Sequence, residues 1–226
     1  MKKTFYITTP IYYPSGKFHI GTAYCTTLVD SIKRYKELRG YDAYMLTGLD
    51  EHGQKIQTKA EENNVSPQEF VDDMAKKAKD LWKLMDISYD DFIRTTDEDH
   101  KKIVQKIFKK LVENGDIYKH SYQGLYCSGC ECFLNEKDLT EDGLCPDHLK
   151  KPEVVSEENY FFKLTKYKDA IIKHIKENPD FIVPAFRANE VLNQLEDIQD
   201  ISVSRAKSNV QWGICLLYTS PSPRDS

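Results

Sequence analysis

The sequence predicts an α/β fold built around the first part of a parallel sheet. Two short apolar runs, at residues 4–9 and 42–47, are separated by a segment with helical periodicity. Each run is followed by a turn that contains glycine and histidine. Strand, helix and strand in this order are typical of a parallel sheet, and ligands of such sheets bind beyond the carboxyl ends of the strands.

The segment between the two strands is predicted to be an amphipathic helix that ends at Gly40. Its apolar residues recur every three or four positions, which places them on one face of a helix. They are Tyr24, Leu28, Ile32, Tyr35 and Leu38.

The turn between the first strand and this helix has the features of an anion site. His19 and Gly21 stand where free backbone N–H groups and the helix dipole favour a negative charge. A histidine there can donate to a phosphate, and Gly21 lets a nucleotide approach the backbone. The alternative is that His19 only fills a loop. The preceding strand and the following helix favour phosphate binding.

The second strand leads into Asp50-Glu51-His52-Gly53. Because both strands are parallel, this turn and the first should lie at the same edge of the sheet. The alternative is that Asp50 merely caps a helix beginning near Gln54.

Further helices follow, and we assign them no chemistry. Ser66 and Glu69 form a predicted capping box with Pro67 at the first helical position. Another helix is expected from Thr96 to Gly115. Arg94, which precedes it, is interpreted as a structural residue.

Four cysteine and histidine residues have the spacing of a zinc knuckle. The two pairs C-x2-C and C-x2-H consist of Cys127, Cys130, Cys145 and His148. Two short loops of this kind can direct four ligands at one tetrahedral ion, which favours structural zinc over a redox pair.

Composition sets the outer limits on function. The chain has 226 residues, 32 basic and 36 acidic side chains and a net charge of −4, so a dominant basic field for nucleic acid is excluded. The start has no apolar signal region, and no run is long enough to span a membrane. We expect a cytoplasmic protein that has no membrane contact, in which cysteines bind metal rather than form disulfides.

The first turn, PIYYPSGKFHIGTAY, resembles the HIGH signature of class I aminoacyl-tRNA synthetases, and its flanks resemble the methionyl-tRNA synthetases. The stretch LTG-x-DEHG and residues 91–97 resemble the same family. The signature reads His19-Ile20-Gly21-Thr22, so Thr22 replaces the second histidine. Its hydroxyl can donate a hydrogen bond but carries no charge.

The resemblance implies a methionine–tRNA ligase, which uses ATP to form methionyl-adenylate and then charges tRNA(Met). It implies catalytic roles for His19 and Thr22 in stabilising the ATP phosphates. It also implies that ATP contacts Gly21, His52 and Gly53. Methionine would contact Ile11, Tyr13 and Asp50. Magnesium is expected with ATP, and structural Zn²⁺ is expected in a connective domain.

The resemblance also implies a domain order. Residues 1–115 would be the first half of a Rossmann-like catalytic domain, and residues 116–214 an inserted connective domain with the zinc knuckle. The last part, residues 215–226, reads as an unrelated or disordered tail. We expect that the second half of the sheet and its KMSKS loop are missing from this chain, which would then be an inactive fragment of a longer protein.

Two alternatives remain. A leucyl-type class I synthetase has a similar Tyr-Pro-Ser-Gly turn. A non-catalytic zinc-knuckle module could bind RNA or a protein through lysines near residues 150–168 and through Tyr160 and Phe161.

Overall fold

The computed structural model describes residues 2–127, 132–134, 139–140, 142–206 and 210–216. Contacts divide the chain into two units. The first unit consists of residues 1–109 and 208–226, and the second of residues 110–207. Helix α4 (Glu98–Glu113) runs across the boundary in sequence. The domain boundaries expected at residues 115 and 214 stay predictions.

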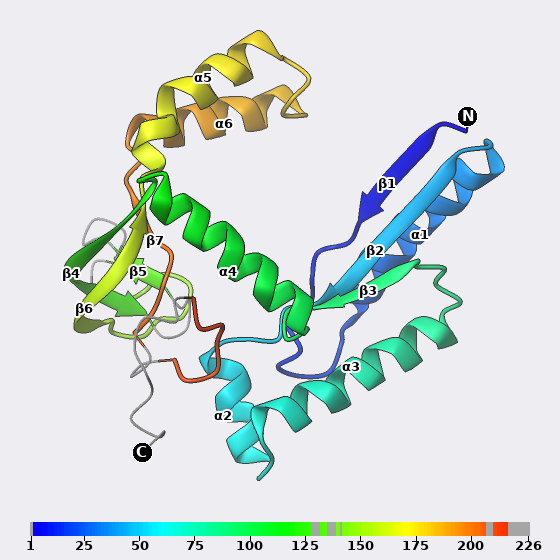
Figure 1. Ribbon diagram of the computed structural model, residues 1–226, viewed down its shortest axis with the longest axis horizontal. Coiled ribbons are helices and arrows are strands. Elements are labelled where there is room, and N and C mark those ends of the chain that lie inside the picture. The colour runs from blue at the N-terminus through cyan, green and yellow to red at the C-terminus, as the bar shows by residue number, and fades with distance from the viewer. Residues whose placement is uncertain (1, 128–131, 135–138, 141, 207–209, 217–226) are drawn as a thin grey trace. The chain divides into compact units, whose positions relative to one another are not determined.

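The first unit contains a parallel sheet in the order β1-β2-β3, which confirms the predicted α/β class (Figure 1). Thr4 of β1 is opposite Asp42 of β2, and Leu46 of β2 is opposite Asp91 of β3. The bounds of the strands are β1 Thr4–Thr8, β2 Asp42–Leu49 and β3 Asp91–Arg94.

Three further helices belong to this unit: α1 (Ile20–Leu38), α2 (Gln54–Glu62) and α3 (Pro67–Leu84). The capping box predicted at the start of α3 is confirmed, because the Ser66 hydroxyl accepts from the Glu69 N–H and the Glu69 carboxylate accepts from the Ser66 N–H. Gly40 follows α1 with a φ of 82°, a conformation that glycine adopts without strain.

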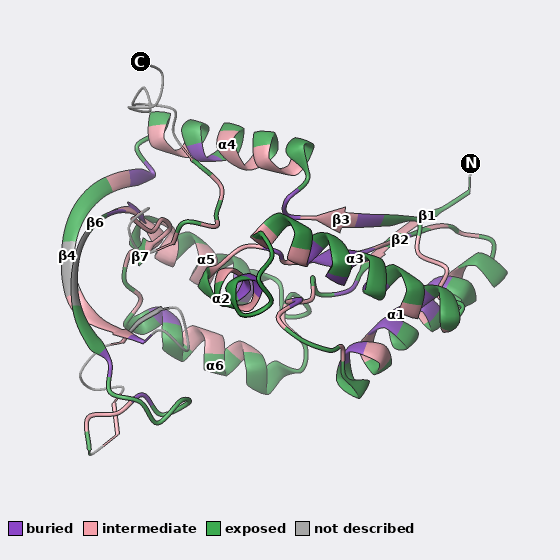
Figure 2. Ribbon diagram, turned by 90° about the horizontal axis from the view of Figure 1, so that it is seen from below, coloured by how far each residue is buried: buried purple, intermediate pink, exposed green. Residues whose placement is uncertain are grey.

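Helix α1 buries the face opposite to its apolar stripe. Tyr24, Leu28, Tyr35 and Leu38 are exposed, whereas Thr22, Thr26, Val29, Asp30 and Lys33 are buried (Figure 2). The buried charges have partners: Asp30 accepts from the Ser88 N–H at 2.7 Å, and Lys33 pairs with Asp90 at 3.0 Å. These contacts fix α1 to the loop between α3 and β3.

The core of the first unit lies between the sheet and α3. Its buried cluster joins Leu49 of β2, Phe92 of β3 and Trp82 of α3, and Tyr12 and Phe18 pack against it. Gly48 is required in β2, because a Cβ there would lie 2.1 Å from the carbonyl oxygen of Ile93. The core therefore extends directly under the carboxyl end of β2.

The second unit contains an antiparallel sheet in the order β5-β4-β6-β7 and two longer helices. Its elements are β4 Ile117–Cys127, β5 Cys132–Leu134, β6 Glu153–Phe162, η2 Leu164–Tyr167, α5 Lys168–Glu177, α6 Ala185–Glu196 and β7 Ile201–Ser202. Strand β4 pairs with β6 over ten residue pairs, from Ile117 with Phe162 to Tyr126 with Glu153. Among the described residues, no helix is long and apolar enough to cross a membrane.

Candidate functional site

The two predicted turns lie side by side at the carboxyl edge of the parallel sheet. The segment after β1 runs along the end of β2, where the Tyr12 N–H donates to the Gly48 carbonyl at 3.1 Å and the Asp50 N–H donates to the Tyr12 carbonyl at 2.9 Å. Ile11 and Tyr13 flank Tyr12, so the structure brings these two residues close to Asp50 along the backbone. Ile11 is exposed, and Tyr13 and Asp50 are half-buried.

Tyr12 also connects this edge to the start of α1. Its hydroxyl lies 2.7 Å from the Thr26 hydroxyl and 3.5 Å from the Thr22 carbonyl. Since the Thr26 hydroxyl donates to the Thr22 carbonyl at 3.0 Å, the Tyr12 hydroxyl is the donor to Thr26. Burial raises the pKa of Tyr12, which keeps the hydroxyl protonated. Sequence reasoning selected Tyr13 and missed Tyr12.

His19 is the N-cap residue of α1. Its Nδ1 accepts a hydrogen bond from the Gly21 N–H at 3.0 Å, and its side chain is exposed. A nitrogen that accepts carries no proton, so in the neutral ring the proton is on Nε2, which is available as a donor. His19 stands at a strand-to-helix turn, as expected, and its ring caps the helix; its role in phosphate binding stays a prediction.

Gly21 is needed for the position of the His19 ring. A Cβ on Gly21 would lie 2.9 Å from His19 Cε1 and 3.0 Å from Nδ1. From the sequence, Gly21 is expected to let a nucleotide approach the backbone; in the structure it also leaves room for the His19 ring. Thr22, unlike His19, is buried, and its N–H donates to the His19 carbonyl at 3.0 Å.

The second turn is held in place by its own residue Glu51, which is fully buried. Its carboxylate accepts from Arg94 Nε at 2.8 and 3.1 Å and from the Thr96 hydroxyl. Its backbone N–H donates to the Thr95 hydroxyl at 2.8 Å. Burial raises the pKa of the Glu51 carboxyl, and the Arg94 guanidinium and the Thr96 hydroxyl counteract that rise. Arg94 also binds Asp72 at 2.7 Å, which agrees with its interpretation as a structural residue.

The same turn is contacted from the other side by Trp212. Its Nε1 donates to the Glu51 carbonyl at 2.6 Å, and its carbonyl accepts from the Gly53 N–H at 3.1 Å. The rings of Trp212 and His52 are 5.5 Å apart. Burial lowers the pKa of His52 to about 4, and the positive charges of Lys101 and His100 act in the same direction. His52 is therefore neutral near pH 7.

Asp50 does not cap α2, so the alternative assignment of that residue is wrong. The N-cap position of α2 is Gly53, which has a φ of 112° and no capping side chain. That φ lies in the region where residues with a Cβ are strained. The turn is therefore shaped by Gly53 and by contacts with distant residues.

Three of the four predicted metal ligands come together in the second unit. The ligand atoms of Cys127, Cys145 and His148 all lie within 4.8 Å of one another, and Cys145 Sγ is 3.8 Å from His148 Nδ1. Ligands on one tetrahedral zinc, at about 2.3 Å for sulfur and about 2.0–2.1 Å for nitrogen, are about 3.5–3.8 Å apart. The three residues thus fit a zinc site. Cys130 lies outside the described residues.

Backbone hydrogen bonds shape the loop that carries Cys145 and His148. The Cys145 N–H donates to the Lys150 carbonyl at 2.9 Å, and the Leu149 N–H donates to the Cys145 carbonyl at 2.8 Å. Both cysteines are buried and His148 is exposed. The loop therefore directs a buried sulfur and an exposed imidazole to the same point.

The surface expected for a binding module is largely occupied by contacts within the second unit. Phe161 is buried, Lys166 pairs with Asp116, and Lys168 Nζ donates to the Glu196 carbonyl at 2.7 Å. Lys150 and Lys151 remain exposed, so the binding-module alternative is not tested by these contacts.

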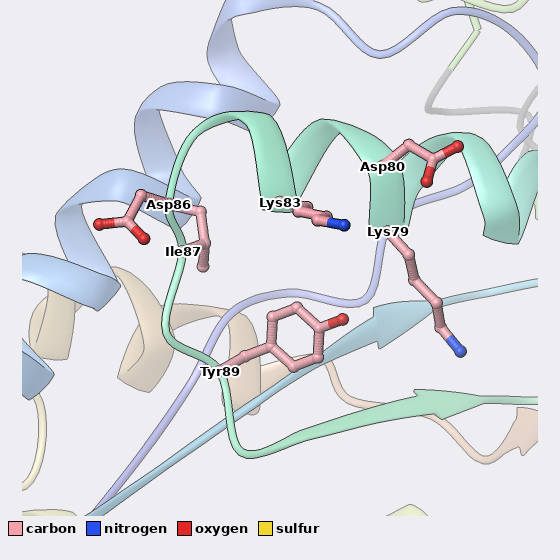
Figure 3. A pocket seen from close by; sticks show the side chains of 6 residues that line it. All are labelled: Lys79, Asp80, Lys83, Asp86, Ile87 and Tyr89. Atoms are coloured by element: carbon pink, nitrogen blue, oxygen red, sulfur yellow. The ribbon is translucent and has the colours of Figure 1, made fainter.

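Figure 3 shows a surface pocket of the first unit, and none of the candidate residues lines it. It is lined by side chains of α3 and of the loop that leads into β3, namely Lys79, Asp80, Lys83, Asp86, Ile87 and Tyr89. Because this loop enters β3 at its amino end, the pocket is at the opposite edge of the sheet from the two turns. The candidate site is an edge formed by two turns.

Comparison with known proteins identifies the class to which this fold and these turns belong. The family model described as "tRNA synthetases class I (M)" matches residues 5–150 and 148–219. The chain belongs to this family of class I tRNA synthetases.

The relatives give a more particular likeness. The chain is 55% identical over 219 residues to the methionine–tRNA ligase of Clostridium acetobutylicum, covering 96% of this chain and 34% of the relative. It is 56% identical to that of Caldanaerobacter subterraneus, covering 95% and 33%. The chain thus spans about a third of the length of these relatives.

A solved structure supports the same likeness at the level of the fold. Mycobacterium tuberculosis methionyl-tRNA synthetase in complex with methionyl-adenylate matches with a TM-score of 0.86 and 35% identity, covering 94% of this chain and 42% of that one.

Proposed function

We propose that this chain is part of a methionine–tRNA ligase. The observation that carries the proposal is the 55% identity over 219 residues to a protein of that name. The arrangement of the two turns supports it, because both lie at the edge of a parallel sheet where nucleotides bind.

The proposed reaction has two steps. A carboxylate oxygen of methionine attacks the α-phosphorus of ATP, which forms methionyl-adenylate and releases pyrophosphate. The terminal adenosine hydroxyl of tRNA(Met) then attacks the methionyl carbonyl, and AMP leaves. Negative charge develops on the phosphate oxygens in the first step, so donors placed there stabilise the transition state.

We assign the stabilising donor to His19. Its Nδ1 is held by the Gly21 N–H, which leaves Nε2–H to donate toward a phosphate oxygen. The N-terminus of α1 adds a favourable dipole. In the proposal, Gly21 and Thr22 complete this part of the ATP site. Thr22 contributes from its buried position at the start of α1.

Methionine is assigned to the edge between the turns. Asp50 would bind its ammonium group, and Ile11 and Tyr13 would line the pocket of its side chain. The hydrogen bond between the Asp50 N–H and the Tyr12 carbonyl supports this grouping, because it holds the three residues near one another. His52 and Gly53 would contact the adenosine.

Zinc is proposed as a structural ion held by Cys127, Cys145 and His148, with Cys130 as the fourth ligand. Three thiolates and one imidazole form a closed ligand set, which is typical of structural zinc. When bound, it would order the loops of the second unit. Magnesium is expected to accompany ATP.

The test uses a chimera, because the chain spans about a third of its relatives. Residues 1–214 would replace the matching part of the Clostridium acetobutylicum relative. We expect methionine-dependent exchange of pyrophosphate into ATP. His19→Ala should lower this exchange about 100-fold or more, while the zinc content stays unchanged.

His174→Ala is the matched control, since His174 is exposed on α5 in the second unit. It should leave the exchange unchanged. Exchange that depends on leucine instead of methionine would replace the proposal by the leucyl alternative. Full activity of His19→Ala would remove the assignment of His19.

A further inference from the structure

We infer that Trp212 is a positioning residue for the nucleotide, which holds the turn at residues 51–53 in the shape that meets ATP. This inference rests on the proposed function, which places His52 and Gly53 at the adenosine. Trp212 received no role from the sequence analysis, and it is separated from Glu51 by 161 positions.

Trp212 contacts three consecutive residues of the turn through different groups. Its indole N–H binds the Glu51 carbonyl, its ring lies against His52, and its carbonyl accepts from the Gly53 N–H. The indole N–H and the main-chain carbonyl of Trp212 thus bind backbone groups on both sides of His52. The contacts of Trp212 fix the peptide groups that surround His52.

The opposite side of the turn is fixed by Glu51. The backbone N–H of Glu51 is bound by Thr95, and its carboxylate is bound by Arg94 and Thr96. With the indole on the Glu51 carbonyl, each polar group of this buried residue has a partner. The turn is therefore held between the end of β3 and Trp212.

The local sequence does not supply this shape alone. Gly53 adopts a φ of 112°, and the start of α2 has no capping side chain. Glycine can adopt this conformation but does not prefer it, because it samples many others in the unfolded chain. Contacts from distant residues must select it. A site whose backbone is held in place before the ligand arrives binds at a lower cost of ordering.

The first experiment measures hydrogen exchange of the 226-residue chain by mass spectrometry. Trp212→Phe removes the indole N–H and keeps a ring near His52. It should speed exchange in residues 50–57 about 3- to 10-fold, the value of one hydrogen bond. Trp212→Ala should give a larger increase, about 10- to 100-fold, because the ring contact is also lost.

Leu81→Ala is the control for a general loss of stability. Leu81, on α3, packs against the core of the first unit. This variant should speed exchange throughout β2 and α3, whereas the Trp212 variants should leave those elements unchanged. Unchanged exchange in residues 50–57 of the Trp212 variants would overturn the inference. An increase of equal size throughout the first unit would also overturn it.

The second arm separates this inference from the proposed function. Addition of Mg²⁺ and ATP should slow exchange in residues 50–57 of the chimera, and slow it less in the Trp212→Ala variant of the chimera. If ATP gives no protection to these residues in the chimera, the assignment of the nucleotide to this turn falls. The comparison without ATP still decides whether Trp212 holds the turn.

The KM values of the chimera for ATP and methionine provide a further test, because a purely structural role would not change one of them selectively. Trp212→Phe should raise the KM for ATP about 3- to 10-fold and leave the KM for methionine within about 2-fold, since Asp50 is bound by Tyr12 and not by Trp212. An equal rise in both values, or no rise in either, would contradict the inference.

Discussion

The two turns at the carboxyl edge of the sheet are built in opposite ways. In the first, His19 is exposed, and its side chain is held by the N–H of Gly21, a residue of its own helix. In the second, Glu51 is fully buried and bound by residues from β3, from the loop after β3 and from the segment around Trp212. One turn depends on neighbours two positions away and the other on residues up to 161 positions away.

This difference separates chemistry from architecture. An exposed ring with an outward donor can meet a ligand, and its replacement should change activity more than folding. A buried carboxylate bound by a guanidinium and a hydroxyl contributes to the fold, and its replacement should change stability first. Both turns belong to one proposed site, so the comparison predicts different outcomes for substitutions in the first turn and in the second.

The largest effect on stability is expected from Glu51→Gln. This change removes one charge from a buried pair, and breaking such a pair costs about 3–5 kcal/mol. Because Arg94 keeps Asp72 as a partner, we expect about 2–4 kcal/mol. Urea unfolding of the 226-residue chain measures the loss. His19→Ala, which removes only an N-cap, should cost about 0.5–2 kcal/mol. Equal losses for both variants would remove the contrast between the turns.

A pH dependence of up to about 3 kcal/mol is expected from His52. Its pKa is about 4 in the folded chain and 6.5 in the unfolded one, so below pH 6.5 the unfolded chain binds a proton that the folded chain does not. Stability should therefore fall as the pH drops from about 6.5 to about 4.

His52→Gln isolates this contribution from that of the carboxyl groups. Urea unfolding of both proteins at about pH 7 and about pH 4.5 should show a smaller loss in the variant, by about 1–3 kcal/mol. Parallel losses in the two proteins would mean that burial at Trp212 does not keep His52 neutral.

Gly21→Ala should separate activity from stability in the first turn. The new Cβ would lie 2.9 Å from the His19 ring and force it to move. We expect about 10- to 100-fold weaker methionine activation in the chimera, since a shift of about 1 Å in a catalytic group has effects of this size. Stability should change by less than about 1 kcal/mol, because alanine also favours the helix.

Gly16→Ala is the matched control, because no atom lies within 4 Å of the new Cβ. It should leave activation within about 2-fold of the unaltered chimera. Equal losses for the two alanine variants would show that flexibility of the turn, and not the position of His19, limits activation.

The sequence predicted the features that depend on near neighbours. The strands β1 and β2, the start of α1 at His19, the capping box of Ser66 and the end of α1 at Gly40 all have local signals. The zinc spacing is also local within each pair, which is why Cys145 and His148 could be placed on one loop. Such features can be predicted because a few neighbouring residues determine them.

The sequence did not predict the features that depend on distant partners. The apolar stripe of α1 is real, but the buried face carries Asp30 and Lys33, whose partners lie in the loop before β3. A hydrophobic pattern cannot indicate that a charge is buried when its partner is unknown. For the same reason, no local signal marks Trp212 or the partnership of Glu51 with Arg94.

The smallest predicted effect concerns the link between the turns. Tyr12 binds Asp50 through its backbone and Thr26 through its hydroxyl, so Tyr12→Phe removes only the connection to α1. We expect a loss of about 0.5–1.5 kcal/mol in urea unfolding, the value of one hydrogen bond. Tyr24→Phe, on the exposed face of the same helix, should stay within about 0.5 kcal/mol of the unaltered chain.

A double-mutant cycle then tests whether this one bond couples the two turns. Thr26→Val removes the partner of the Tyr12 hydroxyl, and the double variant should lose about 0.5–1 kcal/mol less than the sum of the single variants. Additive losses would mean that the hydroxyl acts elsewhere. With coupling, weaker activation by Tyr12→Phe in the chimera would follow from a displaced α1, because the backbone bond to Asp50 stays in place. His19 would then depend on Tyr12 for its distance from the second turn.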